Sequence, residues 1–142
     1  MKNPSNDLRT AYYNALNCFI TVNSVLVPIY SKIIPANNPQ IYIILSTETG
    51  TQEKNKDRGL REHTLVIDIV TLFDAFTGDV SKANEIEEKV SQIINNGTQI
   101  NLSPRFNCIT TREEQNQEII IQTSLETIIR KVVRYAHLIE EI

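Results

Sequence analysis

Residues 63–73 read HTLVIDIVTLF and carry the strongest strand signal in the chain. Two sets of side chains alternate along this stretch: Thr64, Val66, Asp68, Val70 and Leu72 form one, and Leu65, Ile67, Ile69, Thr71 and Phe73 form the other. Strict alternation is typical of a β-strand whose two faces have different surroundings. The second set is the more apolar, so we expect that face of the strand to pack against helices.

A second apolar stretch, IYIIL at residues 41–45, precedes this strand and predicts another buried strand. Between the two lies the polar run 46–61, which we expect to be a loop of about sixteen residues, longer than a usual hairpin connection. Its content of Glu, Lys, Asn and Asp is typical of a segment that stays mobile until a partner orders it. A plain flexible surface loop fits the same composition.

Two amphipathic helices flank the strands in sequence. Residues 5–17 have Ser5 as the expected N-cap and place apolar side chains at helical spacing, namely Leu8, Ala11, Tyr12, Ala15, Leu16 and Phe19. Residues 81–94 repeat the pattern with Ala83, Ile86, Val90, Ile93 and Ile94 and end at an Asn-Asn-Gly sequence. We expect both helices to lie on one face of the sheet.

The remaining segments complete the sheet. Residues 25–34 predict a strand that is either an edge strand or begins just after Pro28, because proline cannot donate to a central ladder. The turn at 36–39 predicts a hairpin into residues 41–45. Short strands are expected at 99–102, 106–110 and 118–123. In the C-terminal segment 124–142, the apolar doublets fit a helical stripe and a two-sided strand equally well, so a strand and a helix both remain open.

Composition supports this arrangement. A chain of 142 residues suits a single domain, 1–142, and a hydrophobic fraction of 41% with 6% aromatic residues predicts an aliphatic core rich in β-branched side chains. The expected fold class is therefore α+β, with an antiparallel sheet of four to six strands and two helices packed on one face.

The net charge and the two cysteines limit the classes of function that the sequence supports. A formal net charge of −3 gives no electrostatic reason for sequence-specific binding of nucleic acid, and neither a signal peptide nor a membrane span is predicted. We therefore expect a cytoplasmic site of synthesis and no membrane partner. Cys18 and Cys108 lack metal-ligand spacing, and we expect both to be reduced thiols facing the core.

No residue cluster specifies a reaction. The two histidines, His63 and His137, belong to no catalytic motif, and the four glycines are dispersed singly, which argues against a phosphate-binding loop. Glu85, Glu87 and Glu88 are most simply a solvated helix face. We predict no catalytic residue, no metal site and no cofactor.

Several sequence blocks in this order carry a resemblance to a known family. They are VPIY at 27–30, PQIYIIL at 39–45, the strand at 63–72, the helix around Ile86 and Val90, and IIRKVVRY at 128–135. This order resembles the tail-completion, or tail-terminator, proteins of tailed bacteriophages. The resemblance covers about residues 7–95 and extends to the closing block, and it implies that the closing block is a strand.

The resemblance also implies a function and partners. It suggests a structural virion protein of the neck or tail, made in the bacterial host cytoplasm, that forms a homo-oligomeric ring at the head–tail junction beside head-connector and tail proteins. Its contact with a sister subunit or an adjoining ring is expected in the polar run, through Thr49, Gln52, Glu53, Lys54, Lys56, Asp57 and Arg58.

Two other functional classes remain as alternatives. A small cytoplasmic adaptor or regulatory domain would use the same loop on one host protein without joining a particle. A hydrolase would need His63 or His137 beside Cys18, Cys108 or a serine, a pairing that no motif in the sequence supports.

Overall fold

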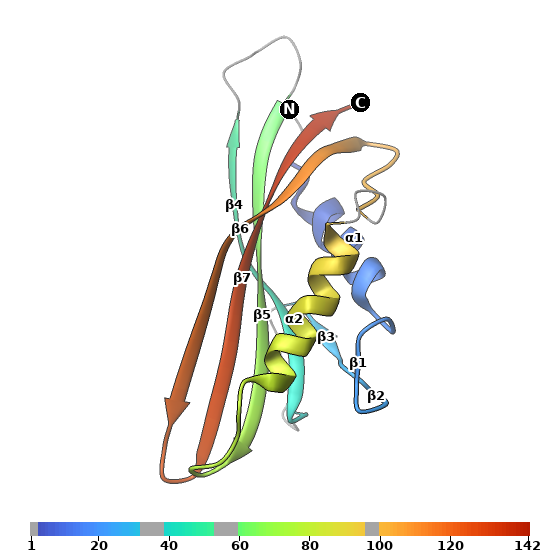
Figure 1. Ribbon diagram of the computed structural model, residues 1–142. Coiled ribbons are helices and arrows are strands. Elements are labelled where there is room, and N and C mark those ends of the chain that lie inside the picture. Colours follow the sequence, from blue (N-terminus) through green and yellow to red (C-terminus); the bar gives the residue numbers. More distant parts are fainter. Residues whose placement is uncertain (1–2, 32–38, 53–59, 96–99) are drawn as a thin grey trace.

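The computed structural model describes residues 3–31, 39–52, 60–95 and 100–142, and it shows an α+β fold (Figure 1). Its elements in chain order are α1 (Ser5–Leu16), β1 (Thr21–Val22), β2 (Val25–Leu26), β3 (Ile29–Tyr30), β4 (Ile41–Gln52), β5 (Leu60–Asp74), α2 (Ser81–Ile94), β6 (Phe106–Gln122) and β7 (Glu126–Glu141). Strands β1 and β2 form a small two-stranded hairpin, and the other five form the main sheet. Both helices lie on the same side of that sheet, as expected (Figure 1).

The main sheet has the strand order β3-β4-β5-β7-β6. Strand β5 lies in the middle, and β7 enters between β5 and β6 over nearly its whole length. All pairs are antiparallel except β3 with β4. The sheet is therefore mostly antiparallel, as the sequence predicts.

Strand β3 lies at the edge of the sheet and begins just after Pro28, as expected, but residues 25–26 of the expected strand belong to the β1–β2 hairpin. The expected hairpin into residues 41–45 is wrong. Strand β3 runs parallel to β4, with Ile29 beside Ile43 and Tyr30 beside Ile44. Pro28 has no N–H, yet its carbonyl accepts a 2.9 Å hydrogen bond from the backbone of Ile43. A parallel pair needs a connection that returns to the starting end, so a tight turn cannot join these strands.

The core lies between the helices and one face of the sheet. Leu65, Ile67 and Ile69 of β5 are fully buried there, so the more apolar set of this strand faces the helices as expected. Five residues of α1 and four of α2 complete the layer, namely Leu8, Ala11, Tyr12, Ala15, Leu16, Ala83, Ile86, Val90 and Ile94.

The start and end of α1 differ from expectation. Ser5 is the first helical residue and not the cap; its N–H donates to Asn3 Oδ1 at 3.0 Å, while its hydroxyl donates to Glu48. Phe19 was expected on the buried face but is 67% exposed. It lies beyond the end of α1, where Cys18 adopts a φ of 68° and turns the chain away from the helix axis.

The polar run expected as a loop at 46–61 is largely strand. Strand β4 continues to Gln52 and β5 begins at Leu60, with Thr49 opposite Thr64 and a register shift between Leu45 and Glu48. Polar residues fit here because the ladder satisfies the backbone groups of residues 48–52, while Arg9 pairs with the Glu48 carboxylate. Residues 53–59 lie outside the described residues.

The C-terminal third contains two long strands in place of several short ones. The strands expected at 106–110 and 118–123 belong to the single strand β6, and residues 100–102 are not strand. The alternative left open for 124–142 resolves as strand, because β7 spans Glu126–Glu141 and fills the space between β5 and β6. The implication of the family resemblance for this block is confirmed.

The sheet face opposite the helices carries no second layer within the described residues (Figure 1). Val66, Asp68 and Val70 of β5 are nevertheless buried on that face, because side chains of the flanking strands shield the central strand. There the Arg130 guanidinium donates two hydrogen bonds to the Asp68 carboxylate, from Nε to Oδ1 at 3.2 Å and from Nη2 to Oδ2. A lone acid on this strand is thus explained by an ion pair.

Candidate interaction surfaces

Of the residues predicted to make subunit contacts, two lie in β4 and the others lie outside the described residues. Thr49 lies within β4 and its hydroxyl is hydrogen bonded to that of Thr64, while Gln52 is the last residue of β4 and pairs with Arg61 in register. The other five, Glu53, Lys54, Lys56, Asp57 and Arg58, lie outside the described residues. Their role in contacts therefore stays a prediction.

The two histidines meet across the ladder of β5 and β7, buried beneath α1. His137 Nδ1 donates to the carbonyl of His63 at 2.8 Å, and its Nε2 is hydrogen bonded to the hydroxyl of Tyr12. Burial lowers the pKa of His137 to about 4. The ring is therefore neutral at pH 7, and its two nitrogens are occupied in anchoring α1 to the sheet.

A charged network beside this pair clamps α1 onto the irregular part of β4. Arg9 Nε donates to Glu48 Oε2 at 3.0 Å, and the same guanidinium donates to the carbonyls of Leu45 and Ser46. His63 Nε2 lies 3.4 Å from the other oxygen of Glu48. Burial lowers the pKa of His63, against the opposing attraction of Glu48. These contacts position α1 against β4, while neither ring nitrogen of His63 makes a hydrogen bond within the described residues.

The cysteines do not complete a nucleophilic site in the part of the chain that the structure describes. Both thiols are free. Cys108 is half-buried and contacts Thr111, and burial raises its pKa, which keeps the thiol protonated. Cys18 is exposed, so the expectation that it faces the core is wrong; it lies in the turn that ends α1. No hydrogen bond among the described residues joins either cysteine to a histidine.

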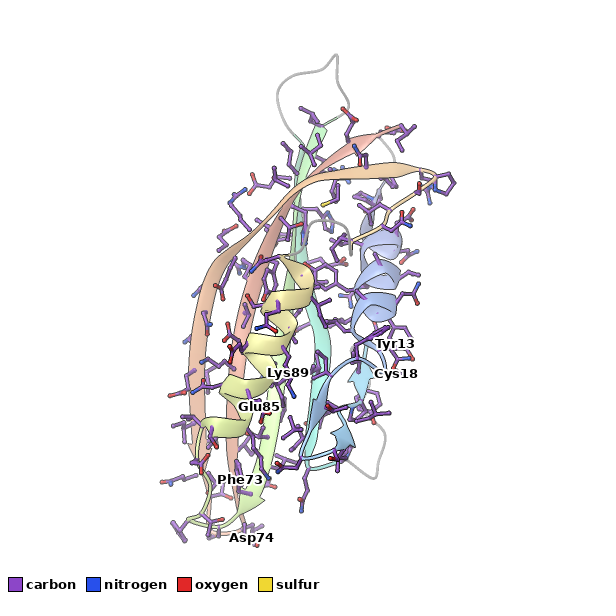
Figure 2. All side chains as sticks on the ribbon, turned by 45° about the vertical axis from the view of Figure 1, so that its right-hand side comes forward. Tyr13, Cys18, Phe73, Asp74, Glu85 and Lys89 are labelled. Carbon is purple, nitrogen blue, oxygen red and sulfur yellow. The ribbon has the colours of Figure 1, made fainter. Side chains whose placement is uncertain are left out.

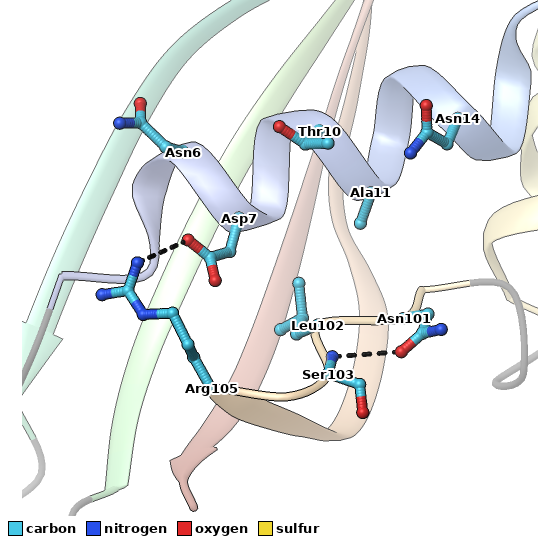
Figure 3. A pocket seen from close by; sticks show the side chains of 9 residues that line it. All are labelled: Asn6, Asp7, Thr10, Ala11, Asn14, Asn101, Leu102, Ser103 and Arg105. Carbon is cyan, nitrogen blue, oxygen red and sulfur yellow. Dashed lines mark hydrogen bonds and ion pairs between the residues drawn. The ribbon is translucent and has the colours of Figure 1, made fainter.

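A polar cleft of about 620 Å³ opens between α1 and the turn at residues 101–105 (Figure 3). Asn6, Thr10 and Asn14 line one wall, at a spacing of four residues along α1. Across the cleft Arg105 pairs with Asp7 at 3.2 Å, so the charges that line it offset each other. The carboxamides and the hydroxyl on this wall can hydrogen bond a polar partner. In the sequence, the i, i+4, i+8 spacing of these residues on the polar face of α1 is the feature that could have predicted the wall of the cleft.

Besides single exposed positions such as Ile109 and Ile142, several large apolar side chains are exposed at each of two places in the described residues. The first is the end of the sheet where β5 stops and β6 turns into β7, with Phe76 at 73%, Ile120 at 53%, Ile121 at 40% and Leu125 at 86% exposure. The second is the β1–β2 hairpin and the turn before it, with Phe19, Val25 and Leu26. Exposed apolar groups gathered in patches mark interaction sites more often than isolated ones do. Scattered positions in the sequence gave no sign of this clustering.

Two further features of the described residues limit the kinds of site. No group of three or more His, Cys, Asp or Glu side chains is placed to hold a metal ion within the described ranges. Neither α1 nor α2 has the length and apolar character needed to cross a bilayer.

Comparison with known proteins gives a structural likeness. No protein-family model matches the chain, and a search of curated proteins found no match. Among solved structures, the chain is similar to one described as "Virion of native gene transfer agent (GTA) particle", with a TM-score of 0.76 and 18% identity. The likeness covers 99% of this chain and 99% of that one. The two chains therefore share one fold over their whole compared length.

Proposed function

We propose that this protein is a structural virion component that forms an oligomeric ring at the head–tail junction of a phage-like particle, in the manner of a tail-completion or tail-terminator protein. The observation that carries the proposal is the match along 99% of both chains to a chain of a gene transfer agent virion. The resemblance of the sequence blocks to tail-completion proteins points to the same class.

The open edges of the sheet support assembly with like subunits. In the described residues, β6 pairs only with β7, and β3 covers β4 only at Ile43 and Ile44. Arg9 occupies the carbonyls of Leu45 and Ser46 on the β4 side, so the two sheet edges present different surfaces. Unlike surfaces on one subunit suit head-to-tail contacts, and such contacts close into a ring when the rotation permits.

We further propose that the β4–β5 end of the molecule, with Thr49, Gln52 and residues 53–58, reaches the adjoining subunit or ring. Its position at one extreme of the long β4–β5 pair favours a contact beyond the subunit's own core. This proposal is separate from the ring itself and is tested by shortening the hairpin.

Deletion and complementation in the producing phage or particle test the function. Particles made without this protein should accumulate as separate heads and tails in electron micrographs, and the wild-type chain supplied in trans should restore joining. A chain in which a short glycine turn replaces residues 53–58 should fold, with unchanged circular dichroism, and should fail to restore joining.

The opposite result favours the adaptor alternative. An adaptor or regulatory domain would leave particle joining intact on deletion, would be missing from purified particles by mass spectrometry, and would sediment as a monomer or dimer. Normal joining with the shortened hairpin would exclude that end of the molecule as the contact while leaving the ring proposal in place.

A further inference from the structure

The main sheet has two outer edges, and they differ in how far they are open. Strand β6 forms one edge, and no further strand lies beside it in the part of the chain that the structure describes (Figure 2). Strand β4 forms the other edge wherever β3 does not cover it, since β3 is only two residues long. Edge strands carry unpaired N–H and C=O groups, which can pair with a strand of another molecule.

Residues 115–122 make the longer open edge. They follow the last register shift of β6 and pair with β7 without further interruption. The N–H of Thr123 donates to the carbonyl of Glu126 at 2.9 Å, and inward and outward groups alternate along an antiparallel ladder. Glu118 and Ile120 therefore direct their main-chain groups away from β7. These groups are available to a strand of another molecule, since β7 is the only described strand beside β6.

The β4 edge turns the same kind of group outward just past the end of β3. The N–H of Leu72 donates to the carbonyl of Gln40 at 2.7 Å, and the β4–β5 register is regular up to Leu45. By the same alternation, Ile43 and Leu45 direct their main-chain groups away from β5. In agreement, the N–H of Ile43 donates to the carbonyl of Pro28, directly before β3. The outward carbonyl of Leu45 follows the last residue of β4 that β3 covers.

Arg9 of α1 occupies this position. Its Nη1 donates to the Leu45 carbonyl at 2.7 Å and to Ser31 Oγ at 3.0 Å, and its Nη2 donates to the Ser46 carbonyl. Its Nε donates to Glu48 Oε2 at 3.0 Å. Only 14% of the Arg9 side chain and 13% of the Glu48 side chain are exposed. All three guanidinium nitrogens thus have acceptors, and two of the acceptors are main-chain carbonyls of β4.

The guanidinium lies where a strand added at this edge would need its own N–H donor. Such a strand must displace Arg9 from charge-assisted hydrogen bonds and leave the largely buried Glu48 carboxylate without its cation. Removing one partner of a buried ion pair costs more than a main-chain hydrogen bond contributes net. The β4 edge is therefore closed to strand addition at residues 45 and 46, between β3 and residues 48–52.

We propose that Arg9 blocks the β4 edge against the β6 edge of a second copy of this chain. Residues 115–122 of that copy are the strand that fits, because they form the long open edge among the described residues and carry one charged side chain, Glu118. If these two unlike edges paired, every copy would keep one of each free, and pairing would continue from copy to copy. Arg9 therefore keeps free chains from joining through their sheets. The inference does not depend on the proposed ring, because it concerns the unassembled chain.

Self-association of the purified chain in reducing buffer tests the block. Arg9→Met combined with Glu48→Gln removes the guanidinium without leaving an unpaired buried carboxylate. Glu48→Gln alone is the matched control, because Arg9 keeps its bonds to the two carbonyls. In sedimentation velocity over a concentration series, the double variant should self-associate with a dissociation constant about tenfold lower than that of the control. Equal association of the two variants overturns the proposal.

A proline on β6 identifies the strand that is added. In the double variant, Ile120→Pro removes an N–H that faces away from β7, so the ladder with β7 is retained and the gain in association should be lost. Ile120→Thr keeps the N–H and removes a similar apolar surface, so the gain should persist. Association that survives Ile120→Pro overturns the β6 edge as the partner. A loss with Ile120→Thr as well also overturns it, because an apolar contact is then responsible.

A purely structural role of Arg9 gives a different result. It would lower the urea midpoint of the double variant without any gain in association. Far-UV circular dichroism checks that the variants fold. Should the double variant not fold, Arg9→Gln with Glu48→Gln replaces it, because a carboxamide keeps a polar group beside β4 with one nitrogen in place of three. The same comparison with Glu48→Gln then decides the proposal.

Discussion

At the scale of single residues, His137 makes the fold sensitive to acid. It is fully buried between Tyr12 and the His63 carbonyl, and the guanidinium of Arg112 and the His63 ring add to the lowering of its pKa. Folding therefore holds the imidazole neutral, whereas the unfolded chain takes up a proton near pH 6.5.

The resulting pH dependence has a defined sign. A pKa lowered from 6.5 to about 4 corresponds to about 3 kcal/mol of unfolding free energy, complete above pH 6.5 and lost as the pH falls toward 4. His137→Gln should flatten this decline relative to wild type in urea unfolding at pH 7.0, 5.5 and 4.5. Equal slopes for the two proteins would show that other groups govern acid unfolding.

The ion pair between Asp68 and Arg130 is a second contact at this scale, and its removal should lower the free energy of unfolding. Asp68 is 3% exposed in the centre of the sheet, while the Arg130 side chain keeps 37% exposure. Asp68→Ala should lower the unfolding free energy by about 1–3 kcal/mol, since it leaves a partly buried charge without its carboxylate. Arg112→Ala, which removes an exposed pair with Glu62, is the matched control and should cost less than about 1 kcal/mol. Similar urea midpoints for both variants would refute this difference.

At the scale of elements, α2 contributes stability through one face. Ile86 is fully buried against the sheet, whereas the neighbouring Glu85 side chain is 48% exposed. Ile86→Ala should destabilise the protein by about 2–5 kcal/mol by leaving a cavity, and Glu85→Ala should change stability by less than about 0.5 kcal/mol. Thermal or urea unfolding followed by circular dichroism at 222 nm measures both; a small effect of Ile86→Ala would mean that the layer repacks.

The elements also show what the sequence predicts and what it leaves open. The alternation of the two side-chain sets at residues 63–73 predicts β5 correctly, because one face of this strand packs against the helices and the other face has no second layer over it in the described residues. In β7, Ile128 and Val132 face one side and Ile129 and Val133 the other, so doublets that suit a helix also suit a strand between two strands. Pairing with the neighbouring strands, and not local periodicity, determines that this segment is a strand.

The edges of the sheet and its irregular segments were the features that could not be predicted from the sequence. Residues 46–52 are polar and resemble a loop, but residues 48–52 pair with β5 in the ladder and residues 46–47 form its irregularity. No turn residue in the sequence specifies the parallel pairing of β3 with β4. The exposed side chains of Phe76 and Leu125 were not predicted to lie at one end of the sheet, because only the pairing of β5 with β7 brings their turns together.

At the scale of the whole molecule, the sheet order predicts a gradient of backbone protection. Strands β5 and β7 have partners on both sides, whereas β6 has one open side in the described residues. Amide hydrogen exchange by mass spectrometry should be slowest in β5 and β7 and much faster along the β6 edge. Exchange along β6 as slow as that in β5 would contradict this gradient.

The insertion of β7 between β5 and β6 has a consequence for biosynthesis. Strand β6 leaves the ribosome before β7, yet its only ladder partner among the described strands is β7. A nascent chain that ends before residue 126 thus exposes both the centre of β5 and the full length of β6. The sheet is therefore completed only by the last strand to be translated, and a chain that stops before β7 leaves two strands without their central partner.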